Sequence, residues 1–347
     1  MRQIHFIIVI LLLSGTTIFS CKKDEKPTTY NSDKTTLNSV IDSATNIYNN
    51  SEEGKKAGEY APGSRSPLDS TIQLAVSISQ SNAYPQQDIN NAVDNLRRAL
   101  VKFSTFLIQE VSPESLIGYW LFNGNTADSS GHGHDGTPKA GLVGSNAATA
   151  KMGTTLPALT TDRYGNANMA FDFKDASYVE IPYSKELNPS SFTLTLWVKR
   201  HGTNGNNYMF SLNRWNGFKF QLQGANYPFL TVHTTNGYAD VDAGVAVPDE
   251  TWTQIGVSYT DGTMKFYVNG SLVKTQAVNG ALVSLSDPVP VSIGNELPEG
   301  IYNVTDDSSP YAFYGASYFI GSIDDIRFYN TVLSDAELQS IHTQEAP

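Results

Sequence analysis

Residues 192–199, which read F-T-L-T-L-W-V-K, constrain the fold more than any other stretch of the chain. Four apolar side chains fall on one side of this period-2 pattern, and two threonines, Trp197 and Lys199 fall on the other. A strand buried on one face needs this alternation, whereas a helix would spread the four apolar side chains around its circumference. Residues 192–199 are therefore predicted to form a strand, and a second layer must cover its apolar face.

Similar short segments follow one another from residue 116 to residue 329, with no helical pattern between them. The expected strands are 116–122, 169–173, 178–181, 192–199, 208–212, 218–222, 229–233, 252–259, 263–268, 272–276, 289–293 and 317–329. Asp261-Gly262 and Asn269-Gly270 favour the tight turns of antiparallel hairpins. So many strands at short spacing predict a two-sheet antiparallel sandwich over residues 112–347.

The sequence before residue 112 has the helical period instead. Apolar residues recur at i, i+3, i+4 and i+7, with Ser66-Pro67 expected to open the second helix and Ser112-Pro113 to end the third. The expected helices lie at 37–48, 66–81 and 85–110. Three amphipathic helices with short connections predict a small bundle over residues 34–111. Because it has no histidine and only scattered carboxylates, we expect the bundle to act as a spacer.

Residues 1–20 have the layout of a secretory signal, with a positive charge before an apolar run at 6–13 that is too short to span a membrane. Cys21, the single cysteine, follows and resembles the lipidated residue of bacterial lipoproteins. The charged residues after it resemble the tag that sends Bacteroidota lipoproteins to the outer face of the outer membrane. We expect a lipid anchor on Cys21, a tether over 21–33 and a surface location. An ordinary signal peptide with an incidental cysteine is the alternative.

The net charge of −11 is concentrated in the C-terminal part of the chain. Residues 22–113 contain 10 basic and 11 acidic residues, whereas residues 114–347 contain 12 and 23. Proteins that bind nucleic acid present basic surfaces, so a nucleic-acid partner is not expected. The acidic excess leaves carboxylates available for a cation.

The order of motifs from about residue 116 to residue 342 resembles the laminin G-like, concanavalin A-type jelly roll. The motifs are G-Y-W-L-F-N-G-N at 118–125, A-D-S-S-G at 127–131, A-F-D-F at 170–173, Y-V-E-I-P at 178–182, the segments 191–199 and 252–259, F-Y-V-N-G at 266–270 and G-S-I-D-D-I-R-F-Y-N at 321–330. Residues 333–338 extend the match, with Ser334 expected to cap a short helix. The predicted fold class is therefore a three-helix bundle followed by a jelly-roll sandwich.

This resemblance also implies one structural calcium ion at the edge of the sandwich. Asp128 lies in the polar loop after the first expected strand. Asp324 falls on the same face as Ile326 and Phe328 in a period-2 pattern, and a carboxylate on an apolar face needs a partner. Since the first and last strands of jelly rolls are neighbours, Asp128 and Asp324 are expected to share the ion. Turn hydrogen bonds to the two carboxylates are the alternative.

Catalytic residues are not evident in the sequence. Relatives of this fold that cut polysaccharides place acids two and four residues apart on one strand, and no such run occurs here. Asp240 and Asp242 come nearest, in a glycine-containing segment expected to be a loop. His132 and His134 flank a glycine without a nucleophile motif or an H-E-x-x-H pattern. We expect no enzyme, with a glycoside hydrolase or lyase as the less favoured alternative.

Aromatic residues in expected loops point to sugar binding. Trp215 lies with Arg214 and Asn216 in a predicted turn, where a tryptophan has little structural reason to be. The long segment 295–315 adds three tyrosines, and a loop of that length is usually functional or disordered. The candidate ligand residues are Arg214, Trp215, Asn216, Tyr302, Tyr311 and Tyr314. We expect non-catalytic polysaccharide capture, with protein binding or adhesion as the open alternative.

Overall fold

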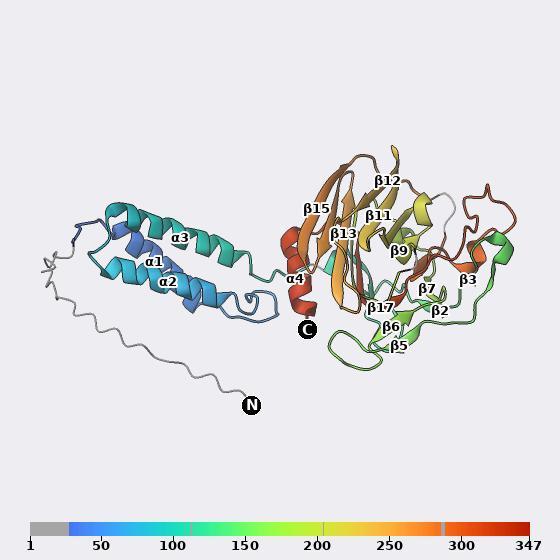
Figure 1. The fold of residues 1–347 in the computed structure, drawn as a ribbon, viewed down its shortest axis with the longest axis horizontal. Helices are drawn as coiled ribbons and strands as arrows, with labels where there is room; N and C mark the ends of the chain where they lie inside the picture. The colour runs from blue at the N-terminus through green and yellow to red at the C-terminus, as the bar shows by residue number, and fades with distance from the viewer. Residues whose placement is uncertain (1–27, 112, 204, 286–288) are drawn as a thin grey trace, which may run out of the picture.

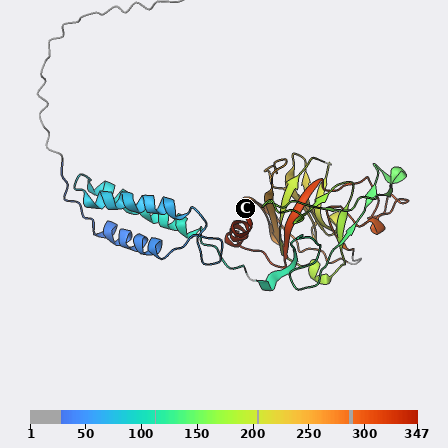
Figure 2. The same ribbon diagram turned by 90° about the horizontal axis from the view of Figure 1, so that it is seen from below.

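The computed structural model describes residues 28–111, 113–203, 205–285 and 289–347. The expected signal peptide, Cys21 and the first part of the expected tether lie outside the described residues. Three helices come first, a two-sheet sandwich follows, and a fourth helix lies against the sandwich on the side of the bundle (Figures 1 and 2). This order confirms the predicted fold class of helices followed by an antiparallel sandwich.

The three N-terminal helices share a hydrophobic core of their own. They are α1 (Thr35–Asn49), α2 (Arg65–Gln80) and α3 (Gln86–Ser104). The predicted stripes face one another, and Leu37, Ile72 and Leu96 are among the buried side chains. Tyr60, from the loop between α1 and α2, stacks on Phe103 with 4.1 Å between ring centroids. The bundle therefore has the core that the helical periodicity required.

Two helix ends differ from the prediction. Helix α3 ends at Ser104, not near residue 110, because the chain then pairs with the loop before α2: Ile108 N donates to Glu59 O at 2.8 Å. Helix α2 begins at Arg65, so Pro67 is the third helical residue and Ser66 is not the cap. No helix in the described part of the chain is both long and apolar enough to cross a bilayer.

The sandwich consists of two antiparallel sheets. In spatial order the first contains β15 (Ser271–Val278), β14 (Gly262–Val268), β13 (Thr253–Thr260), β8 (Phe192–Arg200), β17 (Gly321–Tyr329), β6 (Ala170–Phe173) and β5 (Ala158–Thr160), and β1 (Leu116–Trp120) also pairs with β17. The second contains β12 (Gly237–Asp242), β11 (Tyr227–Thr234), β10 (Phe218–Gln223), β9 (Asn207–Leu212), β16 (Val291–Ile293), β7 (Tyr178–Ile181) and β2 (Thr137–Lys139). The first and last strands are thus neighbours, as expected.

The predicted strand at 192–199 is β8, in the middle of the first sheet. Five short strands were not predicted: β2, β5, β12 and the separate hairpin of β3 (Leu142–Val143) and β4 (Lys151–Met152). Four of them are only two or three residues long, too short to show a period, and the fifth, β12, alternates but contains two aspartates, which are rare in strands. The placement of Asp240 and Asp242 in a loop is therefore wrong, because both lie on β12.

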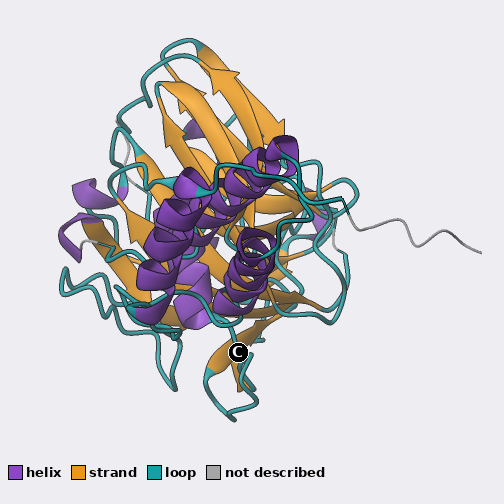
Figure 3. Cartoon of the chain, turned by 90° about the vertical axis from the view of Figure 1, so that its left-hand side faces the viewer, coloured by secondary structure: helices purple, strands orange, loops and turns teal. Residues whose placement is uncertain are grey.

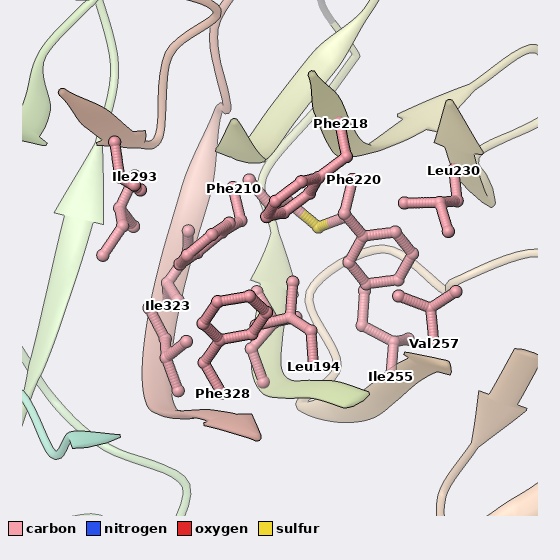
Figure 4. Close-up of a cluster of buried hydrophobic side chains, with 14 of the residues drawn as sticks. Leu194, Phe210, Phe218, Phe220, Leu230, Ile255, Val257, Ile293, Ile323 and Phe328 are labelled. Atoms are coloured by element: carbon pink, nitrogen blue, oxygen red, sulfur yellow. The ribbon is translucent and has the colours of Figure 1, made fainter. Parts of the chain in front are cut away.

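The main core lies between the two sheets (Figure 4). The first sheet contributes side chains such as Leu194, Val257 and Phe328, and the second contributes Phe210 and Phe218. The rings of Phe210 and Phe218 lie within 6 Å of the ring of Phe328, at 5.4 and 5.8 Å between centroids. Both sheets therefore bury one face, which leaves each with an outer face to cover or to expose.

Helix α4 (Asp335–Glu345) covers part of the outer face of the first sheet (Figure 3). Ser334 caps it in a capping box with Glu337, as predicted. Trp197, on the polar side of the 192–199 pattern, is 3% exposed there and donates its Nε1 hydrogen to Glu345 at 2.8 Å. Helix α4 and its partners therefore occupy part of the outer face of the first sheet.

Candidate functional site

The outer face of the second sheet carries polar and aromatic side chains at alternate positions of β9–β12. Lys219 on β10 lies opposite Thr231 on β11, which lies opposite Asp240 on β12. One pair further along, His233 lies opposite Tyr238, and their rings stack at 4.5 Å. The residues between them in sequence point into the core. Lys219 and Thr231 are buried, whereas Asp240 and Tyr238 are exposed, so solvent reaches this face mainly along β12.

The turn from β9 to β10 projects Arg214 and Trp215 over this face. Asn213 and Arg214 both have left-handed backbone angles, with φ of 55° and 41°. Gly217 closes the turn, and only glycine fits there because a Cβ would lie 2.4 Å from Leu212 O. The tight reversal therefore turns two consecutive long side chains, Arg214 and Trp215, out of the strand alternation.

Arg214 joins this turn to the long loop 295–315. Its guanidinium donates to Pro310 O at 2.7 Å and to Ala312 O at 3.0 Å, and it pairs with Glu296 at 3.3 Å. The Arg214 side chain is 0% exposed. Arg214 therefore fixes the loop against the sheet and does not present its charge to solvent, unlike the ligand contact that the sequence suggested.

Below the long loop, Glu296 gathers a small set of polar groups. Tyr208 donates to it at 3.2 Å, and Tyr302 does so at 3.4 Å. Burial raises the pKa of Glu296, and the neighbouring Arg214 charge opposes that rise. Burial also raises the pKa of the Tyr208 hydroxyl and lowers the pKa of the Lys219 ammonium. These groups satisfy one another and stabilise the loop from beneath.

The more accessible counterpart of this arrangement is a row of four aromatic rings and one amide side chain. We name it the aromatic strip, and it consists of Tyr314, Trp215, Asn216, Tyr238 and His233. The Trp215 ring lies 6.3 Å from that of Tyr314 and has the Arg214 guanidinium 3.9 Å from its centroid. At the other end, Tyr238 donates to Asn216 Oδ1 at 3.3 Å. Tyr314 and Tyr238 are 59% and 58% exposed. The strip thus combines accessible rings with amide and hydroxyl groups.

A hollow of about 850 Å³ adjoins the strip at Tyr314. Its walls come from the β3–β4 hairpin, from Asp175 and from residues 314–318 at the end of the long loop. Its volume lies in the range of small-ligand sites, and its position extends the accessible surface from sheet to rim. A ligand longer than one small ring could therefore contact both.

The structure brings four of the six predicted ligand residues, Arg214, Trp215, Asn216 and Tyr314, to one place. The other two, Tyr302 and Tyr311, lie in the same loop but hold it together. The Tyr302 ring packs edge-on against Phe313 at 5.1 Å, and Tyr311 O accepts from Asn303 N at 2.8 Å. Sequence reasoning missed His233 and Tyr238, whose outward positions followed from the alternation of β11 and from a strand, β12, that was not predicted.

The two residues expected to share a calcium ion have separate protein partners. Asp128 accepts hydrogen bonds from the amides of Tyr119, Ser130 and His134 at 2.9, 2.9 and 3.0 Å. Burial works against its charge, but these donors outweigh it and lower the pKa of Asp128. The contacts agree with the turn-hydrogen-bond alternative, and calcium binding stays a prediction.

Asp324 lies on the opposite face of β17 from the one predicted. A bulge between Asp324 and Arg327, with Asp325 at φ of 46°, shifts the alternation by one residue. Ile323 and Ile326 therefore point into the core, while Asp324 points outward and pairs with Arg163 at 2.5 Å. The bulge explains why the period-2 pattern misplaced the carboxylate.

Family comparison agrees with this architecture. Residues 173–339 match the family model described as the concanavalin A-like lectin/glucanases superfamily, and they supply most strands of both sheets. Residues 173–339 are therefore similar to this superfamily, and the sandwich that contains them, which we call the concanavalin A-like domain, has its jelly-roll fold. Among curated proteins, the adhesion G-protein coupled receptor V1 of Danio rerio is 22% identical over 169 residues, 45% of this chain and 2% of that protein. A gellan lyase of Bacillus sp is 32% identical over 76 residues, 22% of this chain and 3% of that protein.

Solved structures similar to the concanavalin A-like domain have low sequence identity to it. One is domain 4 of a GH43 extracellular arabinanase from Geobacillus stearothermophilus, solved with arabinotriose. It is 18% identical with a TM-score of 0.47, and the match covers 66% of this chain and 98% of that chain. The receptor-binding domain of a botulinum neurotoxin mosaic serotype C/D is 14% identical, with a TM-score of 0.47, over 67% and 51% of the two chains. The chain spans only a few per cent of the curated relatives it matches.

The buried acids on the outer face of the first sheet outnumber the arginines among them. Asp324, Asp325 and Glu345 pair with Arg163 and Arg327. Burial, together with the charge of Asp325, raises the pKa of Asp324 from its ordinary 3.8 to about 8. With three carboxylates and two guanidinium groups in one buried cluster, a single proton removes the surplus negative charge.

This cluster predicts the pH dependence of stability. Between about pH 4 and about pH 8 the folded chain keeps a proton on Asp324 that the unfolded chain releases, so the free energy of unfolding should fall as pH rises through this window. Asp324→Asn cannot ionise and should flatten that slope, as measured by urea denaturation across the window. Asp94→Asn, an exposed change on α3, is the control. Equal slopes for wild type and Asp324→Asn would contradict the assignment.

Proposed function

We propose that the concanavalin A-like domain binds glycans without cleaving them and that the aromatic strip is the contact surface. The observation that carries this proposal is the row itself, with Trp215 and Asn216 between two tyrosines that are more than half exposed. Sugar rings have an apolar C–H face and polar edges, and exposed rings beside amide and hydroxyl groups match both. The family description, which names lectins and glucanases, supports the same ligand class.

The position of Trp215 favours binding over a purely structural role. Its ring is half-buried, and the Arg214 guanidinium lies 3.9 Å from its centroid, so the orientation of the ring is set before a ligand arrives. A preorganised ring loses little side-chain entropy on binding. Tyr314 extends the surface toward the hollow of about 850 Å³, which suits a chain of several sugar units.

The acids near the strip support a non-catalytic role. Glycosidases need two carboxylates that face one bond across a fixed gap. Glu296 is buried against Arg214, Asp240 accepts from Thr231 at 2.5 Å, and Asp242 lies 3.7 Å from the Lys274 ammonium. Each of these described acids therefore has a partner of its own. Sugar release from a polysaccharide by the wild-type chain would contradict this part of the proposal.

The test of the binding site uses the full chain and two single changes. The ligand is a polysaccharide that retards the wild type in affinity electrophoresis. Trp215→Ala and Tyr314→Ala should each lower the affinity for it by about tenfold or more, because each removes a stacking surface. Tyr30→Ala removes a tyrosine that is 40% exposed in the N-terminal region and should change nothing. Thermal melts confirm that each variant folds.

Two outcomes would overturn the proposal. Unchanged polysaccharide affinity in both strip variants would place the sugar elsewhere on the molecule. A glycan panel that yields no ligand for the wild type, together with a protein ligand lost in Tyr314→Ala, would assign the same surface to protein binding.

We also propose that the domain is held at the cell surface by a lipid on Cys21. The sequence of residues 1–21 supports this, and the bundle gives the anchor a spacer, since the 19 residues of α3 span roughly 28 Å at 1.5 Å each. Cys21→Ser should move the protein from the membrane fraction to the soluble fraction, as immunoblotting of fractionated cells would show. Membrane retention of the Cys21→Ser chain would contradict a lipid anchor.

A further inference from the structure

Two histidines and a glutamate meet at the edge of the sandwich, away from the aromatic strip. His132 and His134 lie in the loop after β1, and Glu186 lies in the short helix Lys185–Leu187 between β7 and β8. His132 Nδ1 is 2.9 Å from Glu186 Oε2, and His134 Nε2 is 3.4 Å from the same oxygen. One nitrogen from each ring and the carboxylate oxygen all lie within 4.8 Å of one another.

His134 is the informative member of this group. Its side chain is 7% exposed, yet its Nε2 has no hydrogen-bond partner. A buried polar atom in that state costs free energy unless a ligand, ion or water satisfies it. The main chain around it is fixed, because His134 N donates to Asp128 at 3.0 Å and His134 O accepts from the buried indole of Trp120 at 2.8 Å. The ring is therefore held with an open nitrogen facing Glu186.

A histidine–glutamate ion pair explains only part of this arrangement. It accounts for His132, whose Nδ1 has hydrogen-bond geometry to Glu186. His134 Nε2 lies within ion-pair distance of the same oxygen, at 3.4 Å, but makes no hydrogen bond to it. His201 shows what a satisfied pair looks like in the same domain. Its Nδ1 is 2.7 Å from Glu250 and its Nε2 is 3.1 Å from Ser322 Oγ, so both ring nitrogens have partners.

We propose that His132, His134 and Glu186 bind a divalent transition-metal ion, with Zn²⁺ as the best fit. Two imidazoles and one carboxylate are a donor set typical of zinc, whereas calcium takes six or more oxygen ligands. Ligand atoms on a tetrahedral zinc ion lie about 3.3 Å apart, given zinc–nitrogen and zinc–oxygen bonds of about 2.0–2.1 Å. The two separations from Glu186, 2.9 and 3.4 Å, are close to that spacing.

The ion would join two parts of the chain, since His132 and Glu186 are 54 residues apart in sequence. It would tie the loop after β1 to the connection between β7 and β8, at the edge of the concanavalin A-like domain. The Glu186 and His132 side chains are 54% and 34% exposed, so the fourth position of the ion faces solvent and is open to water or to a ligand atom.

The experiment is a titration of Zn²⁺ into the untagged, chelator-treated full chain followed by calorimetry. Cys21→Ser is present throughout, so that the single thiol does not bind metal. We expect one ion per chain with a dissociation constant of about 10 µM or tighter, and Co²⁺ in its place should give the visible absorption of a four-coordinate site. Excess Ca²⁺ should not displace the bound Zn²⁺.

Variants then assign the ligands. His134→Ala and Glu186→Gln should each lower the affinity for Zn²⁺ by at least about tenfold, whereas His201→Ala, which removes the satisfied histidine, should not. Glu186→Gln alters a half-exposed side chain, so it keeps the test valid if His134→Ala fails to fold. The proposal would be overturned if the parent chain did not bind Zn²⁺ saturably. It would also be overturned if the Glu186→Gln chain bound Zn²⁺ as tightly as the parent chain does.

Discussion

The proposed ligand surface of this protein depends on the buried guanidinium of Arg214. Ordering a loop of about twenty residues costs conformational entropy at every position, and few of those residues enter the sandwich core. Arg214 offsets that cost by donating to Pro310 O and Ala312 O while pairing with Glu296. Removing it would leave Glu296 buried beside fewer donors, so the loop and the sheet face are stabilised by one side chain.

This interaction also links fold to function. The left-handed turn at Asn213 and Arg214 turns Arg214 under the loop and holds Trp215 beside Tyr314. Binding residues on loops work best when a rigid scaffold positions them. Here β9 and β10 are the scaffold, and their inward residues, such as Phe210 and Phe218, belong to the main core. The same strands thus supply the packing inside and support the proposed contact surface outside.

Much of the fold was predictable because it follows local rules. Alternation in residues 192–199 identified β8, and Asn269-Gly270 identified the hairpin between β14 and β15, where both residues have positive φ. Two features were not predictable. Strand β12 alternates, with Ala239 and Val241 packed against the core, but its two aspartates and its only partly buried inner residues disfavour a strand prediction. The bulge at Asp325 shifts by one residue which side chains of β17 point into the core, and only the pairing of β17 with β8 reveals that shift.

The site was predictable as a set of unusual residues, but not as an arrangement. A tryptophan in a turn and a long tyrosine-bearing loop both stood out in the sequence. The turn and the loop are joined by the hydrogen bond from Arg214 to Pro310 O. These two residues are 96 positions apart, and no local sequence pattern encodes such a contact. For the same reason His132 and His134 could be noted without Glu186, which lies in a different connection of the sandwich.

The most direct test of the account is hydrogen exchange of the Arg214→Ala chain, read together with its glycan affinity. We predict that amides of residues 303–313 lose protection and that affinity falls by about tenfold or more, while β9 and β10 stay protected. Arg163→Ala removes a comparably buried arginine that pairs with Asp324 of the other sheet, and it should leave loop protection unchanged. Wild-type protection of the loop and wild-type glycan affinity in Arg214→Ala would contradict the account.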